Sequence, residues 1–517
     1  MQINKKDIIL SIFSGILLIA GFPPFDLYPL AWVALVPLLI SLWEKEARAS
    51  FMLGGLTGFI FFLGTIYWVF NSMFNFGHVP ATLSALILII LCVYLGAYIG
   101  LFAVIFNSLS NRSRFPSIVT VPVLWITLEV IRTYAFTGFP WSLLGYTQYK
   151  FLPIIQISDI TGIYGVSFLV AATNGVIFDA AFHRPRRVNK MPLFPERPIT
   201  ASIIACIIII LLTLGYGFLR LNTGMKGRTI RASVIQGNID QGIKWDKQHS
   251  ENILNTYKKL SIRASAGAPD IIVWPESSFP FIYGYDEKPT AELQEFQKNL
   301  HASLLFGSVT AKNDKAGNTL LSNSAVLLSR EGKLLSTYDK IHLVPYGEYI
   351  PLKKLFPFIN KLTAGIGDFV PGKEPVVMKA SFANIGNLIC YEIIFPGLVR
   401  KFVNQGADLL VTITNDAWFG RTSAPYQHFS MAVFRAVENR VPVVRAANTG
   451  ISGFIDSKGR IKRKSDIFVE DVLSENVTIG AFGKSFYAKY GDLFAYLCII
   501  SSVLLIGNNF FHEKRVP

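Results

Sequence analysis

Cysteine and charge are both scarce in this chain of 517 residues. It has four cysteines, and Cys92, Cys206 and Cys498 lie in long apolar runs, where a thiol usually serves as a small hydrophobic side chain. Cys390 is alone in a more polar region, so no disulfide can form within that region. Charged residues make up only 16% of the chain against 51% hydrophobic ones, with a mean hydropathy of +0.41. This composition argues against an ordinary soluble protein.

The sequence also lacks the motifs of several ligand classes. It contains no glycine-rich phosphate loop, no metal-ligand spacing, no internal repeat and no low-complexity tract. The seven histidines are scattered, and His342 is better explained as a packing or hydrogen-bonding residue than as a ligand. The net charge of +15 is spread out without a recognition motif, which argues against nucleic acid as a partner. We therefore expect no metal and no cofactor.

Long apolar runs fill the first 222 residues and recur near the C-terminus. A helix needs about 20 apolar residues to cross a bilayer core. The candidate spans are Ile8–Phe22, Leu27–Trp43, Phe51–Phe74, Pro80–Phe106, Ser117–Ala135, Ile160–Phe182, Thr200–Leu219 and Tyr490–Phe511. Whether the first two, which are short and separated by prolines, each cross fully stays open. We predict a seven-helix transmembrane region at 1–222, a separate domain at 223–488, and a C-terminal helix with a short tail at 489–517.

Basic residues predict the orientation of these spans. Thirteen flank them on one side: Lys5, Lys6, Lys45, Arg48, Arg112, Arg114, Arg184, Arg186, Arg187, Lys190, Arg197, Lys514 and Arg515. The short loops on the other side carry only Lys150. Because positive residues stay in the cytoplasm, residues 223–488 are expected on the outer face. The excess of basic residues in that segment fits an anionic lipid surface or an ordinary solvated face.

Residues 223–488 alternate between strand-like and helix-like segments. The expected strands are Ile230–Gln236, Ile271–Val273, Leu304–Val309, Ser324–Leu328, Ile385–Ile389, Leu409–Ile413 and Val441–Arg445. The expected helices are His249–Ala266, Ala291–His301, Ile394–Gln405 and Gln427–Asn439. This alternation predicts an α/β layered domain.

Three motifs in this domain supply what a cysteine nucleophile needs. Cys390 follows an expected strand and precedes a helical segment, although a buried structural cysteine is the alternative interpretation. Glu276 also follows a strand, and the segment 338–348 supplies Lys340 and Glu348. A thiolate is the attacking species, so the thiol needs a base or a cation nearby. Glu276 can accept the thiol proton, and Lys340 can stabilise the thiolate and an oxyanion.

In this chain order, Glu276, Lys340 and Cys390 resemble the catalytic set of the nitrilase superfamily, and Glu348 matches its second glutamate. The resemblance covers roughly residues 229–480 and includes Gln236-Gly-Asn238 and Thr414-Asn-Asp-Ala-Trp-Phe-Gly420. It implies an α/β nitrilase-like layered (αββα) domain, carried here on an all-α transmembrane bundle of about eight helices.

The whole chain resembles the apolipoprotein N-acyltransferase family. The resemblance implies that Cys390 takes an acyl chain from a phospholipid as a thioester, which then passes to the N-terminal α-amine of a diacylglyceryl-cysteine lipoprotein. It also implies a multi-pass protein of the bacterial inner membrane with a periplasmic catalytic domain, and we expect a monomer. A membrane-tethered nitrilase-type amidohydrolase is one alternative. A transporter or a ligand-binding membrane protein is another, but it leaves the three catalytic candidates unexplained.

The same resemblance suggests substrate-binding residues. Trp245 matches a family tryptophan near the substrate, or it is a rim aromatic; Tyr391 and Glu392 flank the nucleophile in the substrate pocket, although Glu392 can instead partner a nearby cation. Asn323 is expected to orient Lys340, or it is an ordinary strand-edge residue. Residues 351–362, which interleave lysines with apolar residues, resemble a mobile membrane-facing lid; a surface helix is the alternative.

Glu129 and Arg132 lie within an expected span, where charge is costly. Three residues apart, they share a helix face and can pair, or Arg132 can extend its side chain to the interface. An aromatic-rich loop at 139–146 follows them. We predict that this cluster forms the wall of a lipid entrance.

Overall fold

The structure, a computed structural model, describes residues 2–112, 115–181, 187–188, 191–192, 199–244, 246, 248–314, 317–345, 347–349 and 369–513. The chain divides into two compact units. The helical unit comprises Met1–Tyr67, Ala85–Asn222 and Tyr490–Pro517, and the sheet unit comprises Trp68–Ser84 and Thr223–Lys489. The structure places Trp68–Ser84 in the sheet unit, whereas the sequence analysis placed this segment in the transmembrane region; the predicted domains stay a prediction. The assignment of the units to the membrane and the outer face stays a prediction.

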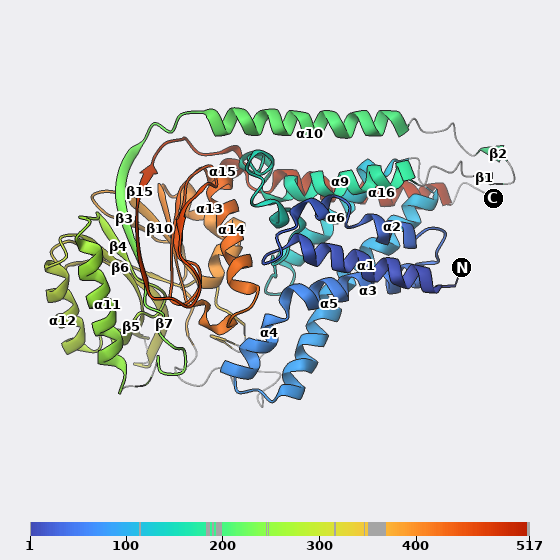
Figure 1. The fold of residues 1–517 in the computed structure, drawn as a ribbon. Helices are drawn as coiled ribbons and strands as arrows, with labels where there is room; N and C mark the ends of the chain where they lie inside the picture. Colours follow the sequence, from blue (N-terminus) through green and yellow to red (C-terminus); the bar gives the residue numbers. More distant parts are fainter. Residues whose placement is uncertain are drawn as a thin grey trace. The chain divides into compact units, whose positions relative to one another are not determined.

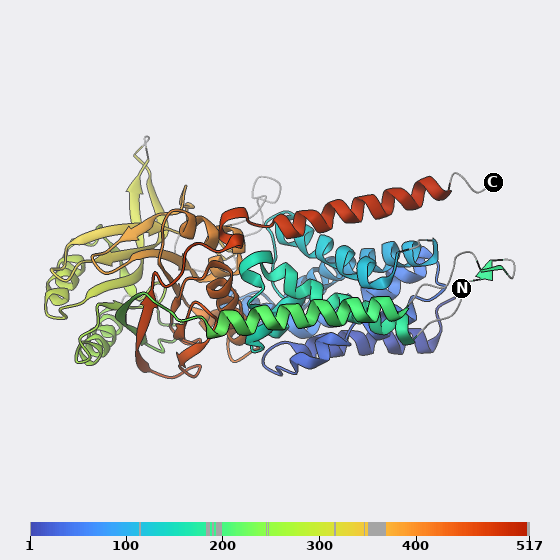
Figure 2. The same ribbon diagram turned by 90° about the horizontal axis from the view of Figure 1, so that it is seen from above.

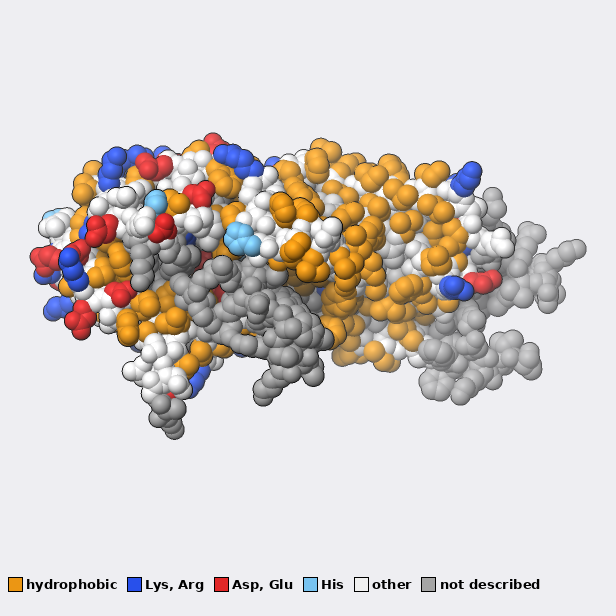
Figure 3. Space-filling model, turned by 90° about the horizontal axis from the view of Figure 1, so that it is seen from below, with side chains coloured by type: hydrophobic (Ala, Val, Ile, Leu, Met, Phe, Trp, Pro, Cys, Tyr) orange, Lys and Arg blue, Asp and Glu red, His pale blue; other side chains and the backbone are white. Residues whose placement is uncertain are grey.

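Long helices running along roughly one axis build the helical unit (Figures 1 and 2). Its helices are α1 (Lys5–Gly21), η1 (Tyr28–Trp32), α2 (Val36–Ser41), α3 (Ala47–Ile66), most of α5 (Ala81–Arg112), α6 (Ser117–Tyr134), η3 (Leu144–Gln148), α7 (Leu152–Ile155), α8 (Ser158–Thr161), α9 (Ile163–Ala181), α10 (Ile199–Asn222) and α16 (Leu493–Glu513). Two short strands, β1 (Arg187–Val188) and β2 (Met191–Pro192), precede α10. Figure 3 shows hydrophobic side chains gathered over these helices, as expected for a lipid-facing surface.

Among the described residues, five helices are long and apolar enough to cross a membrane: α3, α5, α6, α9 and α10. The predicted count of eight spans is therefore not confirmed. The expected span Leu27–Trp43 is instead divided into η1 and α2, each of which has a proline in its first turn. Proline fixes its own φ and has no N–H to donate, so Pro29 and Pro37 start new helices more readily than they continue one. Neither short helix reaches the length that a bilayer requires.

Helices α3 and α5 approach each other through glycine. A Cβ atom on Gly58 would lie 2.6 Å from the Cα atom of Gly96, and one on Gly54 would lie 2.5 Å from the Cβ atom of Ala103. Small residues let helix backbones approach this closely, which is the usual source of packing energy between membrane helices. A larger side chain at Gly58 would force the two helices apart.

Two β-sheets form the centre of the sheet unit. In the first, the spatial order is β15 (Asp471–Ile479), β3 (Arg228–Gln236), β4 (Ile271–Val273), β6 (Ser303–Asn313), β7 (Thr319–Leu328) and β8 (Leu334–Asp339), and β5 (Phe279–Tyr283) pairs with β6. In the second, the order is β14 (Ile461–Lys464), β13 (Gly453–Ile455), β12 (Val443–Ala447), β11 (Leu409–Thr414), β10 (Asn384–Ile389) and β9 (Val377–Lys379). Both sheets have parallel centres, formed by β3, β4 and β6 and by β10, β11 and β12.

Helices cover the outer face of each sheet (Figure 1). The first sheet packs against α11 (Ser250–Ser265) and α12 (Glu287–Lys298), and the second against α13 (Pro396–Asn404) and α14 (Ala424–Asn439). Contacts of β3 with β12 and of β7 with β10 join the two sheets. The predicted αββα layering is therefore confirmed, and every strand and helix expected for this domain is present within a few residues.

The segment Trp68–Ser84 follows α3 in the sequence but packs within the sheet unit. It forms α4 (Trp68–Asn71) and η2 (Ser72–Phe76), which contact the short helix η5 (Asp416–Phe419) after β11. The Ser72 hydroxyl donates to the carbonyl of Trp418 at 2.8 Å. The rings of Trp68 and Phe419 meet edge to face with centroids 4.8 Å apart. The chain thus contributes a piece of its N-terminal half to the loop region of this domain.

Candidate active site

Glu276 lies just beyond the carboxyl end of β4, where the chain leaves the first sheet. Its Oε1 accepts hydrogen bonds from Asn323 Nδ2 at 2.8 Å and from Lys340 Nζ at 3.3 Å, and its Oε2 accepts from the amide of Asn415 at 3.0 Å. Burial alone would raise the pKa of this carboxyl group. The Lys340 ammonium and the Asn323 hydrogen bond outweigh burial and hold the pKa below its usual value. Glu276 is therefore an ionised carboxylate, ready to accept a proton.

Lys340 follows β8, and hydrogen bonds hold both its backbone amide and its side-chain ammonium. Its amide donates to the carbonyl of Asn323 at 2.8 Å, and its Nζ lies 3.3 Å from Glu276 Oε1 and 3.0 Å from Glu348 Oε2. Burial would lower the pKa of this ammonium, but the carboxylates of Glu348 and Glu276 raise it well above its ordinary value. Lys340 thus stays cationic and cannot serve as the base.

Glu348 and Asn323 fix the positions of these two charges. The two N–H bonds of Asn323 Nδ2 reach Glu276 Oε1 and Glu348 Oε1, the latter at 2.7 Å. Glu348 Oε2 also accepts from the amide of Val344 at 2.8 Å. Asn323 was expected to orient Lys340: its carbonyl accepts from the Lys340 amide, and its side chain bonds to both carboxylates that flank the lysine, contacts that support this prediction without testing it.

Cys390 begins the short helix η4 (Cys390–Ile394) after β10, at the predicted strand-to-helix turn. It is buried, and its φ of 52° lies in the left-handed region that residues with a Cβ atom rarely adopt. Burial and the Glu276 carboxylate raise the pKa of the thiol above its ordinary value, whereas Lys340 lowers it. Cys390 therefore rests as a neutral thiol within the electrostatic reach of both charges, and its reaction requires a base.

Glu392 is fully buried and accepts hydrogen bonds from two loops of the site. Its Oε1 accepts from the Tyr338 hydroxyl at 2.7 Å and from the amides of Ile341 and His342 at 2.7 and 3.1 Å, and its Oε2 accepts from the amide of Ile389 at 2.8 Å. Four donors from the protein thus occupy the carboxylate. Glu392 thus joins the Lys340 loop to the turn of the nucleophile, and its predicted role in substrate binding stays a prediction.

The other residues predicted for the site either lie near Glu276, Lys340 and Cys390 or fall outside the described residues. Tyr391 is half-buried and packs edge to face on Phe395, with centroids 5.2 Å apart. His342 stacks on Phe395 at 3.8 Å, in agreement with a packing role. Trp245 and the expected lid at 351–362 lie outside the described residues.

Four buried residues of this site were not predicted from the sequence. Lys244 donates from Nζ to the carbonyl of Glu276 at 2.9 Å, and burial lowers its pKa to about 8. Asp416, His428 and Arg445 form a hydrogen-bonded group next to Cys390. Asp416 belongs to a motif already noted in the sequence, and Lys244 adjoins Trp245; the other two carry no such signal. Among the described residues, no group of His, Cys, Asp and Glu side chains is arranged to hold a metal ion.

Comparison with known proteins identifies the family. A model of the apolipoprotein N-acyltransferase N-terminal domain matches residues 14–176, and the carbon-nitrogen hydrolase model matches residues 231–484. The apolipoprotein N-acyltransferase of Geobacter metallireducens is 43% identical over 504 residues, which cover 97% of this chain and 95% of that protein. The chain belongs to the apolipoprotein N-acyltransferase family.

A second relative agrees with this assignment. The apolipoprotein N-acyltransferase of Pasteurella multocida is 32% identical over 525 residues, covering 98% of this chain and 96% of that protein. Among solved structures, the amidase from Nesterenkonia sp. AN1 is 20% identical with a TM-score of 0.37, over 50% of this chain and 94% of that chain. Membership confirms an acyltransferase with a nitrilase-superfamily domain and favours this activity over that of an amidohydrolase. It also implies a lipoprotein substrate and association with a membrane.

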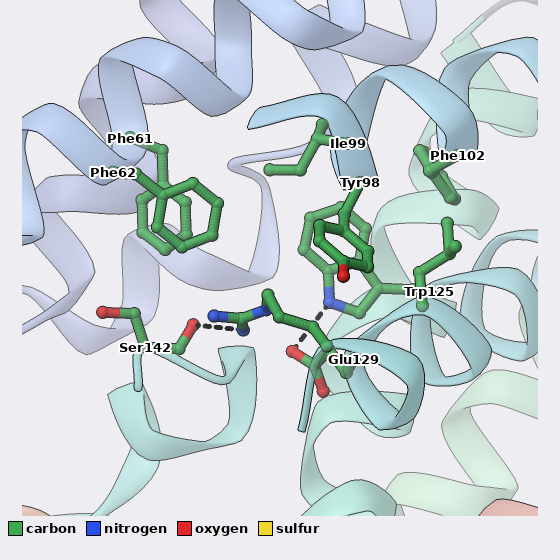
Figure 4. Close-up of a pocket in the computed structure, with 10 residues that line it drawn as sticks. Phe61, Phe62, Tyr98, Ile99, Phe102, Trp125, Glu129 and Ser142 are labelled. Carbon is green, nitrogen blue, oxygen red and sulfur yellow. Dashed lines mark hydrogen bonds between the residues drawn. The ribbon is translucent and has the colours of Figure 1, made fainter. Parts of the chain in front are cut away.

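The helical unit of this acyltransferase contains Glu129 (Figure 4) and Arg132, both buried. Glu129 Oε1 accepts from Trp125 Nε1 at 3.0 Å and from the amide of Leu144 at 2.7 Å. Arg132 donates to the carbonyl of Trp141 at 2.6 Å, in the loop expected at the interface, so both predicted interpretations of Arg132 stay open. Both residues line a small pocket with Phe61, Phe62, Tyr98, Ile99, Phe102, Trp125, Leu128 and Ser142. The lipid entrance stays a prediction.

Proposed function

We propose that Cys390 is the nucleophile of a two-step acyl transfer, with Glu276 as the general base and acid and Lys340 as the stabiliser of the oxyanion. The donor is a membrane phospholipid, and the acceptor is the α-amine of a lipoprotein's diacylglyceryl cysteine. One observation carries the proposal: a neutral, buried thiol lies within the electrostatic reach of an ionised carboxylate and an ammonium that are bonded to each other. A base and an oxyanion partner are the groups that a thiol needs in order to attack an ester.

In the first step, Glu276 accepts the Cys390 proton as the sulfur attacks the ester carbonyl of the phospholipid. The negative charge that develops on the carbonyl oxygen is stabilised by the Lys340 ammonium. The tetrahedral intermediate then collapses, and the carbon–oxygen bond of the ester breaks. The alkoxide of the lysophospholipid leaves with the proton from Glu276, so the carboxylate is restored and Cys390 carries the acyl chain as a thioester.

In the second step, the neutral α-amine of the acceptor attacks the thioester carbonyl. Glu276 accepts a proton from the attacking nitrogen while Lys340 again stabilises the oxyanion. The carbon–sulfur bond breaks, and the proton on Glu276 returns to the sulfur. An amide is formed on the lipoprotein and the resting thiol is regenerated, with no external cofactor in the balance.

The neighbouring residues hold these groups in place. Asn323 and Glu348 fix the separation of Glu276 and Lys340, and Glu392 fixes the two loops that carry Lys340 and Cys390. In this proposal, Tyr391 and Trp245 bind the substrate. Such positioning matters because small displacements of reacting groups lower rates strongly.

The proposal places the sheet unit on the periplasmic side of the bacterial inner membrane, as a monomer. The charge asymmetry of the loops, thirteen basic residues against one, supports this orientation. A donor that resides in the bilayer and an acceptor that is itself lipidated account for a bundle with more apolar helices than a tether requires.

Intact mass measurement of the purified protein tests this function. After incubation with a phospholipid of one acyl length, we expect a mass increase of one acyl group that hydroxylamine removes at neutral pH. A diacylglyceryl-cysteine peptide should remove it as well, and gain the acyl group as an amide. The matched control is Cys390→Ala, which should show no adduct. Steady release of free fatty acid without an acceptor, and no transfer to the peptide, would instead indicate a hydrolase.

A further inference from the structure

Three fully buried residues form a group that the proposed chemistry does not use. Asp416 Oδ2 accepts from Arg445 Nη2 at 2.8 Å, and Asp416 Oδ1 lies 3.1 Å from His428 Nδ1. Arg445 Nη2 is also 3.0 Å from His428 Nδ1. The other ring nitrogen of His428, Nε2, lies 3.2 Å from the carbonyl oxygen of Cys390. The imidazole therefore connects a buried ion pair to the backbone of the nucleophile.

The contact with Cys390 shows which ring nitrogen donates to the nucleophile's backbone. A carbonyl oxygen only accepts, so Nε2 must carry the hydrogen that reaches Cys390. Nδ1 lies between Arg445 Nη2 at 3.0 Å and Asp416 Oδ1 at 3.1 Å, so polar groups hold the ring at both nitrogens. Asp416 in turn holds Arg445, and its other oxygen accepts from the Thr414 hydroxyl at 2.8 Å.

The sheet unit leaves little space for this group to rearrange. A Cβ atom on Gly450 would lie 2.1 Å from Asp416 Oδ2, so only glycine permits the chain to pass there. The ring of Phe419 meets that of His428 edge to face, with centroids 6.2 Å apart. Phe419 is itself packed against Trp68 of the segment that follows α3. The imidazole is therefore restrained both by hydrogen bonds and by packing.

Cys390 is the residue that benefits from such restraint. A left-handed backbone conformation costs a residue with a Cβ atom about 1 kcal/mol or more, so it persists only where the surroundings enforce it. Before the turn, the amide of Ile389 donates to Glu392; at the turn, the Cys390 carbonyl accepts from His428. Side chains from two different elements thus hold the backbone on both sides of the thiol-bearing Cα atom.

We infer that His428 is a positioning residue for the acyl transfer: its Nε2–H bond to the Cys390 carbonyl sets the backbone turn that aims the thiol at the ester. The inference rests on the proposed role of Cys390 as the nucleophile. His428 touches neither substrate nor the reacting sulfur in this assignment. Its effect passes through the main chain of Cys390.

A pair of amide substitutions tests the inference without removing polarity from the cavity. Glutamine places an N–H near the position of Nε2, whereas asparagine places one near that of Nδ1, too short to reach Cys390. We expect His428→Asn to slow single-turnover acylation of Cys390 by about 10–100-fold, because misplaced reacting groups lose rate in this range. His428→Gln should recover most of that rate. The KM for phospholipid should change less than threefold in both variants.

Further measurements separate a positioning role from a structural one. Thermal unfolding of both variants should show similar losses of Tm, so that the difference in acylation rate follows the reach of the donor. His249→Gln, at a more exposed histidine of the same unit, is the matched control and should acylate at the wild-type rate. Equal acylation rates for the Asn and Gln variants, whether wild-type or reduced, would overturn the inference. Absence of an adduct on wild-type Cys390 would instead contradict the proposed function.

Discussion

The two units of this chain each bury a pair of opposite charges, and they satisfy those charges differently. In the helical unit, Glu129 and Arg132 lie three residues apart on α6, and they bond mainly to main-chain groups of the segment that follows. In the sheet unit, Glu276 and Lys340 come from the ends of different strands and bond to each other. The first pair closes a loop against a helix, whereas the second leaves two charges facing a thiol.

The two pairs of charged residues are therefore expected to differ in function. Glu129 accepts from a backbone amide and an indole, so its hydrogen bonds contribute to folding. Glu276 Oε1 accepts from the Lys340 ammonium and from the Asn323 side-chain amide, and Glu276 lies within the electrostatic reach of a neutral thiol. We therefore expect substitutions in the sheet-unit pair to change rates and those in the helical-unit pair to change stability.

The largest effect is expected at the nucleophile. Cys390→Ser should abolish acyl transfer, because a serine hydroxyl has a far higher pKa than a thiol and Glu276 is tuned to a thiol proton. Triple replacement of Cys92, Cys206 and Cys498 by alanine is the control and should cost only packing energy, since all three are buried in the helical unit. N-acylation assays with each purified variant check this. Activity in the serine variant would place the nucleophile elsewhere.

The second effect concerns the base itself. Glu276→Gln keeps the size and the hydrogen-bonding capacity of the side chain but cannot accept the proton. We expect thioester formation to slow by about 10²–10⁴-fold, the usual contribution of a general base. Glu348→Gln should slow it less, because Glu348 positions Lys340 and accepts no proton. Single-turnover acylation with both variants measures the ratio, and a Glu276→Gln rate equal to wild type would exclude this base.

The proposed catalytic residues could be predicted from the sequence because they lie in short motifs at strand ends. Glu276 follows β4 of the first sheet and Cys390 follows β10 of the second. Their meeting was therefore predictable from the chain order that resembles the nitrilase catalytic set, and not from strand geometry. His428 was not, since it lies within a helix and meets Cys390 only through the packing of α14 against the second sheet. Lys244 was missed for a similar reason: its hydrogen bond to the Glu276 carbonyl joins positions 32 residues apart in the sequence.

The sequence analysis also did not predict the edge strands of the two sheets. Strand β14, with the sequence Ile-Lys-Arg-Lys, is fully exposed, and β15 alternates with polar residues. Such edge strands are specified by the neighbour they pair with more than by their own apolar pattern. In the helical unit, Leu27–Trp43 was apolar enough for a span, but Pro29 and Pro37 divide it into two short helices.

A glutamate-to-glutamine substitution in the helical unit provides the contrast with Glu276→Gln. Glu129→Gln should lower the free energy of unfolding by about 1–3 kcal/mol, because one buried acceptor loses charge-assisted bonds to Trp125 and Leu144. The rate of thioester formation per folded molecule should change far less than in Glu276→Gln. Thermal unfolding and single-turnover acylation on the same preparations check both halves. A rate loss equal to that of Glu276→Gln would remove the distinction between the two pairs.

Two buried carboxyl groups near the nucleophile, Glu392 and Asp416, should differ in how pH changes their contribution to stability. Burial, against bonds from backbone amides and Tyr338, raises the pKa of Glu392 to about 6 from 4.5. Asp416 is equally buried, but Arg445 and His428 lower its pKa to about 2 from 3.8. The difference follows from the partners: Asp416 bonds to a full cation, and Glu392 bonds to neutral donors.

The direction of the pH effect follows from which state binds the proton more tightly. Folded Glu392 holds its proton up to a higher pH than the unfolded chain does, so its stabilising contribution is complete below about pH 4.5 and is lost as the pH rises through 6. At 1.36 kcal/mol per pKa unit, the loss is about 2 kcal/mol. Folded Asp416 does the reverse: its contribution is present above about pH 3.8 and disappears only as the pH falls toward 2.

Between pH 4.5 and 7, therefore, Glu392→Gln should gain about 2 kcal/mol of stability relative to wild type as the pH rises. Asp416→Asn should keep a nearly constant offset over this range. Thermal unfolding at several pH values measures both, and a flat offset for Glu392→Gln would mean that its carboxyl group is already ionised at the lower limit, with the hydrogen bonds to Ile341, His342 and Ile389 prevailing over burial.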